Sequence, residues 1–286
     1  MCRAYHDGEE GNLVQLCAHS EKLARTPAPV CVRVLSLAKM PVFLPYDHHL
    51  HCGNPGDLVK HAGLAACVHL LAAPGLPFCY GDAMAAFPEY RKPSPGWDKG
   101  VGAFLECARH GPQFAPYTGC LRPTGLPYPG SALLAAKVCQ KEGALFHGRL
   151  WDLDERAVEA QRKHFEGGNV DVRKEDGLDG LVDSRSEIDF ALIDPPDVSQ
   201  VGRIGAVIAA LADTGAHYLT WTYTDAHADP FHFGGLLREG SAVALRVFWQ
   251  ENQGCQLTFS PRLLETVEEM VKAVCAVMGW AAPVRG

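Results

Sequence analysis

The residues best suited to chemistry form the segment Asp194-Pro195-Pro196-Asp197, directly after the mostly apolar run 188–193. Such a run predicts a buried strand, so Asp194 should lie at the carboxyl end of that strand. That edge of an open α/β sheet is where ligands bind. A carboxylate next to a rigid prolyl carbonyl can accept hydrogen bonds from an NH2 group, which turns the nitrogen lone pair toward a methyl donor. Asp194 and Pro195 are therefore predicted to orient an amine for methylation.

The residue after the two prolines bears on the substrate. Enzymes that methylate an exocyclic amine on a base usually place an aromatic residue there, which stacks on the base. Here the position is Asp197. An anionic side chain offers no stacking surface, and it would repel a phosphate backbone, so Asp197 favours a smaller or cationic amine.

Two further acids follow predicted strands. Asp152 comes after the strand 145–151 and is placed to accept the hydroxyls of a ribose. Asp176-Gly177 follows the strand 170–173 and is placed to hold an adenine, because the acid can take the exocyclic amine and glycine lets backbone come close. Three successive strand ends with Asp predict a nucleoside cofactor across the carboxyl edge. The alternative, for each Asp alone, is that it caps the next helix.

The turn after the first predicted strand (78–82) argues for altered or lost cofactor binding. A nucleotide-binding turn needs glycines, which permit positive φ and close backbone approach. Residues 82–88 read DAMAAFP instead. Because proline cannot adopt positive φ, we expect this turn to take a different path from a glycine loop.

Histidines and cysteines are frequent, but their spacing does not favour metal or disulfide chemistry. Residues 47–51 (DHHLH), with His61 nearby, allow a zinc site, yet no acid or cysteine completes the spacing, so we expect no metal. The eleven cysteines are odd in number and none lies within ten residues of another. This excludes Cys-x-x-Cys pairs and predicts reduced, mostly buried thiols in a cytosol-like compartment.

The chain's alternation of elements predicts what positions these residues. Asn54-Pro55 should start a helix that runs up to Pro74-Gly75, and Ser131 should cap the next. Further helices are expected at 132–141, 155–165, 204–211 and 263–277, and strands at 78–82, 145–152, 170–173, 188–193, 218–223, 242–249 and 255–259. Strands alternating with helices favour an α/β fold with a doubly wound, mostly parallel sheet. Residues 91–127 are expected to be an insertion with one short helical piece, 101–109.

Composition narrows the class of protein. The 286 residues, 47% of them hydrophobic, suffice for one domain plus an insertion or tail. No apolar run approaches the roughly 20 residues that span a bilayer, and the N-terminus lacks a secretory signal pattern. A net charge of −7 does not suggest an avid nonspecific nucleic-acid binder. Two local basic patches could still bind nucleic acid, or could be solvated surface. One consists of Arg91, Lys92 and Lys99, and the other of Arg156, Arg162, Lys163, Arg173 and Lys174.

These residues together resemble the RlmJ-type 23S rRNA adenine-N6 methyltransferases, S-adenosylmethionine enzymes with the Rossmann-like class I methyltransferase fold. The most specific element is 51–61, HCGNPGDLVKH, which fits the family pattern H-x-G-N-x-x-D-x-x-K-H. The resemblance runs with gaps from Tyr46 to the last helix. It implies a methyltransferase domain over 40–286 with a small inserted subdomain at about 91–127. Residues 1–39 are then an N-terminal extension, expected to be disordered.

The resemblance also implies roles for individual residues and a cellular setting. It implies a cytoplasmic monomer without membrane or metal, acting on 23S rRNA before the ribosome is fully assembled. The implied S-adenosyl-L-methionine ligands are Lys60, His61, Ser131, Asp152 (ribose), Asp176 and Gly177 (adenine) and Asp194, which is also the catalytic residue; Tyr46, Pro195 and Pro196 would contact the substrate.

Two departures from the family leave alternatives open. The family's D-T-H-A-G-A-G-R-Y is here residues 82–90, which put Met84 where the family has a cofactor-contacting histidine and lack both glycines. The family's D-P-P-Y ends here in Asp197. The sequence is therefore compatible with methylation of adenine N6 in 23S rRNA, with methylation of another amine, or with a non-catalytic RlmJ-like protein that binds RNA or a partner.

Overall fold

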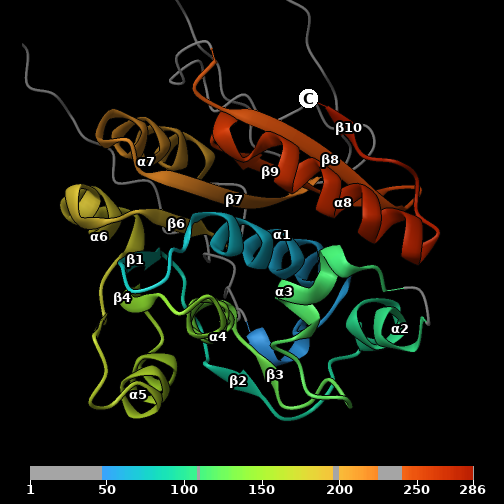
Figure 1. The fold of residues 1–286 in the computed structure, drawn as a ribbon, viewed down its shortest axis with the longest axis horizontal. Coiled ribbons are helices and arrows are strands. Elements are labelled where there is room, and N and C mark those ends of the chain that lie inside the picture. The colour runs from blue at the N-terminus through green and yellow to red at the C-terminus, as the bar shows by residue number, and fades with distance from the viewer. Residues whose placement is uncertain (1–46, 108–109, 196–199, 225–239, 286) are drawn as a thin grey trace, which may run out of the picture. The chain divides into compact units, whose positions relative to one another are not determined.

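A mixed sheet organises the part of the chain that the computed structural model describes, residues 47–107, 110–195, 200–224 and 240–285. Its strand order is β10-β8-β9-β7-β6-β1-β4-β5 (Figure 1). The strands are β1 (Pro77–Asp82), β4 (Leu145–Trp151), β5 (Val170–Arg173), β6 (Phe190–Ile193), β7 (His217–Thr224), β8 (Val243–Gln250), β9 (Gln253–Phe259) and β10 (Val284–Arg285). The strands from β5 to β7 are parallel, and β9 runs antiparallel to both β7 and β8.

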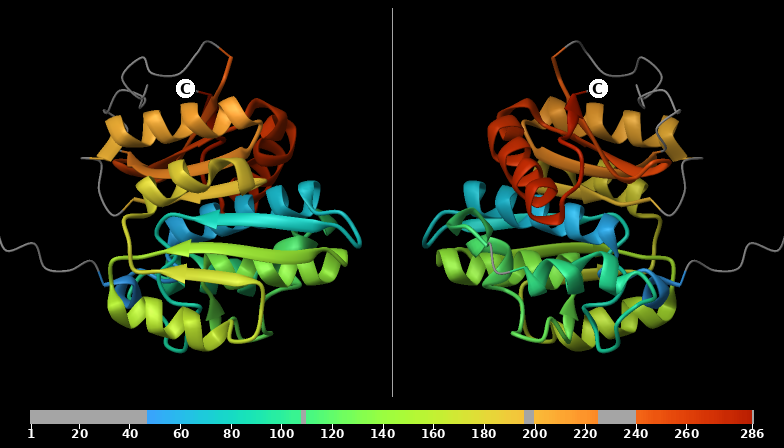
Figure 2. Two further views of the ribbon diagram at one scale, coloured as in Figure 1. Left: turned by 90° about the vertical axis from the view of Figure 1, so that its left-hand side faces the viewer. Right: turned by 90° about the vertical axis from the view of Figure 1, so that its right-hand side faces the viewer.

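Helices cover both faces of this sheet (Figure 2). One hydrophobic core lies between the sheet and α1 (Pro55–Leu71), α4 (Ser131–Glu142), α5 (Glu155–His164) and α8 (Leu264–Met278). A second core lies on the other face, under α6 (Gly177–Ser184) and α7 (Val201–Thr214). Along β6, Phe190 and Leu192 belong to the first core and Ala191 and Ile193 to the second, because successive side chains of a strand point to opposite faces. The predicted doubly wound, Rossmann-like α/β fold is confirmed.

Helix α1 shows how the sequence sets these elements. The Asn54 side chain accepts a hydrogen bond from the Asp57 N–H (2.9 Å), and Pro55 occupies the first turn, as predicted from the cap-then-proline signal. The helix is apolar almost all round because it packs against α4, α8 and the sheet. This placement holds its N-terminal turn, with Asp57 and Lys60, near the carboxyl edge of the sheet.

Most expected elements are confirmed with shifts of a few residues, and two expectations need correction. Helix α6 was not predicted, because its eight residues include Gly177 and Gly180, which disfavour helix. The insertion 91–127 holds two helices, α2 (Val101–Glu106) and α3 (Ala115–Thr118), in place of one helical piece. A separate two-stranded sheet pairs β2 (Glu89–Tyr90) with β3 (Tyr128–Pro129) at its ends.

The remaining general expectations concern thiols and membranes. The eight cysteines in the described ranges are all free and buried or half-buried, as predicted for reduced thiols. No helix of these ranges is both long and apolar enough to cross a membrane.

Candidate active site

Acids from four strand ends meet at the carboxyl edge of the sheet. Because β1, β4, β5 and β6 are parallel, the residues that follow them lie at the same edge, and Asp152, Asp176 and Asp194 line one pocket of about 670 Å³. Trp221 and Tyr223, from the end of β7, line the same pocket. Tertiary structure thus brings together the three acids that were singled out in the sequence.

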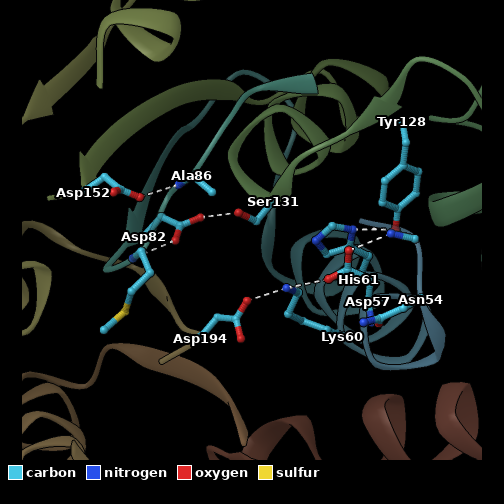
Figure 3. A network of polar contacts seen from close by, with 12 residues as sticks. Asn54, Asp57, Lys60, His61, Asp82, Ala86, Tyr128, Ser131, Asp152 and Asp194 are labelled. Carbon is cyan, nitrogen blue, oxygen red and sulfur yellow. Dashed lines mark hydrogen bonds and ion pairs between the residues drawn. The ribbon is translucent and has the colours of Figure 1, made fainter. Parts of the chain in front are cut away.

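Asp194 is held from the direction of α1. The Lys60 ammonium bonds its carboxylate and also lies 2.8 Å from a carboxylate oxygen of Asp57 (Figure 3). Burial lowers the pKa of Lys60, but the two carboxylates outweigh this and hold the pKa well above its ordinary value. Burial raises the pKa of Asp57, whereas Lys60 lowers it, together with the Gly53 N–H, and the result is about 2. Lys60 and Asp57 are therefore both charged at neutral pH.

His61, on the next position of α1, is turned away from Asp194. Its Nδ1 lies 2.6 Å from the Tyr128 hydroxyl, which is 3.1 Å from the Tyr117 hydroxyl. Burial lowers the pKa of His61 to about 3, so its imidazole is neutral. His61 does line a small polar cavity of about 30 Å³, together with Lys60 and Ser131, beside the main pocket.

Ser131 does not cap α4, contrary to expectation. Gly130 is the N-cap residue, and the Ser131 hydroxyl donates to a carboxylate oxygen of Asp82 at 2.6 Å. The Tyr80 hydroxyl donates to the same oxygen at 2.7 Å. Burial of Asp82 raises its pKa, these two hydrogen bonds lower it, and the result is about 6. Asp82 was not among the predicted site residues, although its position at the end of β1 was the signal available.

The turn after β1 keeps one feature of a glycine loop. Ala86 has φ 50°, in the left-handed region that favours glycine, and it stands where the resembled family has its first glycine. Its N–H donates to an Asp152 oxygen at 2.8 Å. The expected difference from a glycine loop therefore does not extend to the φ of Ala86. Met84, in place of the family's histidine, lines both the main pocket and the small cavity.

Asp152 and Asp176 differ in how their carboxylates are held. Asp152 accepts the N–H groups of Ala86 and Asp154, and α5 is capped by Asp154, so the capping alternative is wrong for Asp152. Asp176 does cap α6, through the N–H groups of Leu178 and Asp179. Asp152 therefore keeps more acceptor capacity toward the pocket than Asp176 does.

Arg203 also occupies the Asp176 carboxylate. Its two terminal nitrogens lie 2.9 and 3.0 Å from the two carboxylate oxygens, and these bonds lower the pKa of Asp176. A carboxylate accepts about four hydrogen bonds, and Asp176 already accepts four. Nothing in the sequence indicated Arg203, which lies on α7.

Gly177 is needed for packing. A Cβ at this position would lie 1.8 Å from the Ala83 carbonyl oxygen, so the glycine lets the start of α6 approach the turn after β1. The close approach of this backbone to an adenine stays a prediction. Gly177 also lines the pocket.

Several earlier expectations fall elsewhere. Tyr46, Pro196 and Asp197 lie outside the described residues. His49 packs against Phe87, with ring centroids 4.6 Å apart. Within the described ranges, no three His, Cys, Asp or Glu side chains are grouped so as to hold a metal ion.

Of the comparisons with known proteins, one bears on the fold. No family model matches the chain, and no curated protein matches its sequence. Among solved structures, it is similar to protein LPL1258 from Legionella pneumophila str. Philadelphia 1, family model DUF519, with 16% identity over 82% of this chain and 97% of that chain and a TM-score of 0.66. The Escherichia coli protein yhhF, described as a candidate methyltransferase, gives 12% identity over 76% and 87% and a TM-score of 0.37. The likeness to LPL1258 supports a shared fold, and a fold does not define a function.

Proposed function

We propose that this protein is an S-adenosylmethionine-dependent methyltransferase that acts on the exocyclic N6 amine of an adenine in 23S rRNA. The observation that carries the proposal is the placement of Asp194 and Pro195 at the carboxyl end of β6, on the wall of a pocket that also holds Asp152 and Asp176. The predicted amine-orienting pair and the predicted nucleoside-binding acids thus share one cavity. The resemblance to RlmJ-type enzymes assigns these residues the same roles.

The main pocket suits the cofactor in size and charge. Its volume of about 670 Å³ is within the ~300–1,000 Å³ typical of small-molecule sites. Six carboxylates line it, against one arginine and one histidine: Asp152, Asp154, Glu155, Glu175, Asp176 and Asp194, with Arg156 and His48. S-adenosylmethionine carries a net positive charge, so this lining attracts it.

The proposed ligands divide between the two cavities. Asp152 would hold the ribose, and Asp176 with Gly177 the adenine, in the main pocket. Lys60, His61 and Ser131 would serve the methionine end, beside the small cavity. Because about 30 Å³ is room for a water molecule and not for an amino-acid group, these three residues can reach the cofactor only at the mouth of the cavity or after side chains move.

In the mechanism, this chain supplies orientation and charge. When bound, S-adenosylmethionine supplies an electrophilic methyl group. The Asp194 carboxylate and the Pro195 carbonyl accept hydrogen bonds from the amine, which fixes the direction of the nitrogen lone pair. Lys60 holds the Asp194 carboxylate in place, and the fixed carboxylate stabilises positive charge that develops on nitrogen. Trp221 and Tyr223 provide an aromatic surface on the same pocket wall, where a base splayed from its stack could lie.

The remaining parts of the proposal follow the family resemblance. We infer a cytoplasmic monomer that requires no metal and takes its 23S rRNA before the ribosome is fully assembled. Tyr46 and Pro196 would complete the substrate contacts.

Two measurements test the proposal. Calorimetric titration with S-adenosylhomocysteine should show binding. Absence of heat at high micromolar ligand would refute both methyltransferase hypotheses and favour a non-catalytic binding protein. Tritiated methyl groups should then enter a 23S rRNA transcript with the natural protein and not with Asp194→Ala. Label that persists in Asp194→Ala would refute the role of that carboxylate.

A second candidate is methylation of a small cationic amine. The six carboxylates that line the pocket favour a cation over a phosphate backbone. In that case S-adenosylhomocysteine binds, the rRNA transcript stays unlabelled, and small polyamines accept the tritiated methyl group.

A further inference from the structure

A second hollow lies beside the main pocket and shares one wall with it. It has a volume of about 480 Å³ and is lined by residues from the start of α1, from residues 95–99 and from the ends of β7, β8 and β9. Tyr223 lines both cavities. We call this second hollow the side groove. A single-stranded nucleic acid with one nucleotide in the main pocket would therefore have the next nucleotide at the side groove.

The lining of the side groove combines aromatic rings with amide groups. Tyr223, 45% exposed, packs edge-on against Trp221 with centroids 4.8 Å apart. Trp249 is half-buried and braced by Trp280, 6.0 Å away. Gln250 and Gln253 line the groove beside them. Braced rings suit base stacking, and amides can hydrogen-bond base edges.

The charge of the side groove is opposite to that of the main pocket. None of its lining residues is a carboxylate, and Lys99 contributes a cation. Lys99 has no ion pair with another described residue. The start of α1, at Asn54 and Pro55, also lines the groove, and the N-terminal end of a helix carries partial positive charge. Although the chain has a net charge of −7, the local positive charge of the side groove favours an anionic ligand such as a phosphate.

The other basic cluster found in the sequence, between Arg156 and Lys174, is less suited to bind an anion. Arg156 pairs with Asp154 and Lys174 with Glu155, while Arg173 pairs with Asp171. Nearby carboxylates thus compensate that surface. Of the two candidate patches, the one with Lys99 lines the side groove, whereas Arg156 of the other lines the main pocket, where it pairs with Asp154.

We propose that the side groove binds the nucleotide next to the target adenine in a single-stranded RNA segment. Tyr223 and Trp249 stack on its base, the glutamine amides contact the base edge, and Lys99 neutralises its phosphate. This inference rests on the proposed function, because it takes the main pocket as the place of the target base.

Binding of a fluorescein-labelled single-stranded RNA decamer, one adenine flanked by uridines, tests the proposal by fluorescence anisotropy. Trp249→Ala should weaken binding about tenfold, which corresponds to about 1.4 kcal/mol. Lys99→Gln should weaken binding at low salt and reduce the slope of log K against log salt by about 0.7. Both variants should bind S-adenosylhomocysteine as the natural protein does.

Matched controls separate the groove from general effects. Lys163→Gln, on α5, removes a lysine that lines neither cavity and should leave RNA binding unchanged. Trp249→Phe keeps an aromatic ring and should bind RNA within about threefold of the natural protein. Thermal melting of both variants shows whether weaker RNA binding by Trp249→Ala results from misfolding.

Three outcomes would overturn the inference. The variants bind the decamer like the natural protein; the natural protein binds S-adenosylhomocysteine but no RNA; or a poly-glutamate decamer competes as well as RNA, which would make the groove a peptide site. If S-adenosylhomocysteine does not bind but RNA binding still depends on Lys99 and Trp249, the groove is upheld and the methyltransferase proposal fails.

Discussion

Two groups of acids at one sheet edge are held in different ways. The inner group, Asp57 and Asp82, is bonded by side chains, and Asp82 is 0% exposed. The outer group, Asp152 and Asp176, faces the main pocket and accepts four backbone N–H groups, three of them two or three residues away, besides the two terminal nitrogens of Arg203. Asp82 has one partner remote in the chain, Ser131, whereas Asp57 is held by Lys60 and by the Gly53 N–H, three and four residues away. The Asp82–Ser131 bond therefore ties α4 to the site, while Asp152, with two accepted N–H groups, keeps acceptor capacity for a ligand.

Burial explains why these similar side chains differ in charge. The buried carboxyl of Asp82 has only hydroxyl donors and one N–H near it, so burial prevails and its pKa is about 6. The Asp57 side chain is 16% exposed and touches the Lys60 ammonium, so its pKa is about 2. The ion pair between Asp176 and Arg203 is exposed to solvent, and exposed pairs contribute little to the free energy of unfolding. Substitutions in the two groups should therefore have effects of different size and kind.

The largest effect should follow from breaking the inner ion pairs. Lys60→Met leaves Asp57 and Asp194 facing each other without a cation, so the free energy of unfolding should fall by about 3–5 kcal/mol, measured by urea unfolding at pH 7. Lys272→Met, which removes an exposed pair with Glu268 on α8, should cost less than about 0.5 kcal/mol. Equal losses in the two variants would refute the distinction between buried and exposed pairs.

The pH dependence of stability should show the buried Asp82. Its carboxyl has a pKa of about 6 in the folded protein and about 3.9 when unfolded, so the folded state binds the extra proton between these values. The stability contributed by that proton is complete below about pH 4 and is lost as pH rises through 6. Relative to Asp82→Asn, the natural protein should lose about 2 kcal/mol between pH 4 and pH 7. Parallel urea-unfolding curves for the two proteins over this range would contradict the expectation.

A substitution at the boundary between the groups should have a smaller effect. Gly177→Ala forces a shift of α6 or of the turn at Ala83, so stability should fall by about 2–3 kcal/mol and S-adenosylhomocysteine binding should weaken. Gly202→Ala on α7 is the matched control, because nothing lies within 4 Å of a Cβ there. It should raise stability by up to about 1 kcal/mol. Normal ligand binding by Gly177→Ala would show that the close approach to Ala83 is not required.

The smallest effect on stability should come from the outer group. Arg203→Ala removes an exposed ion pair and should change stability by less than about 1 kcal/mol. It also releases two acceptor positions of Asp176, so S-adenosylhomocysteine should bind a few-fold more tightly, measured by calorimetry. Asp179→Ala removes the other Arg203 contact without releasing Asp176 and should leave affinity unchanged. Weaker binding by Arg203→Ala would instead make Arg203 a ligand contact.

The chain's local patterns predicted the outer acids better than the inner ones. Asp152 and Asp176, like Asp194, each follow a predicted strand, and parallel strands end at the same edge, so their meeting could be foreseen. The Asp82–Ser131 bond joins residues 49 positions apart, and Ser131 was expected to cap its own helix. A serine hydroxyl at the start of a helix can cap that helix or bond a side chain of another element. Here the position of Asp82 on the neighbouring strand β1 determines which bond forms.

By itself, the sequence determined the alternation of strands and helices, the start of α1 at Asn54-Pro55 and the row of acids at strand ends, because each depends on residues close together in the chain. Tertiary structure decided which carboxylates are charged, that Arg203 bonds Asp176, and that Tyr223, Trp249 and Lys99 share a groove. These outcomes depend on burial and on contacts between distant segments. Electrostatic free energies change with both, so residue order alone does not define them.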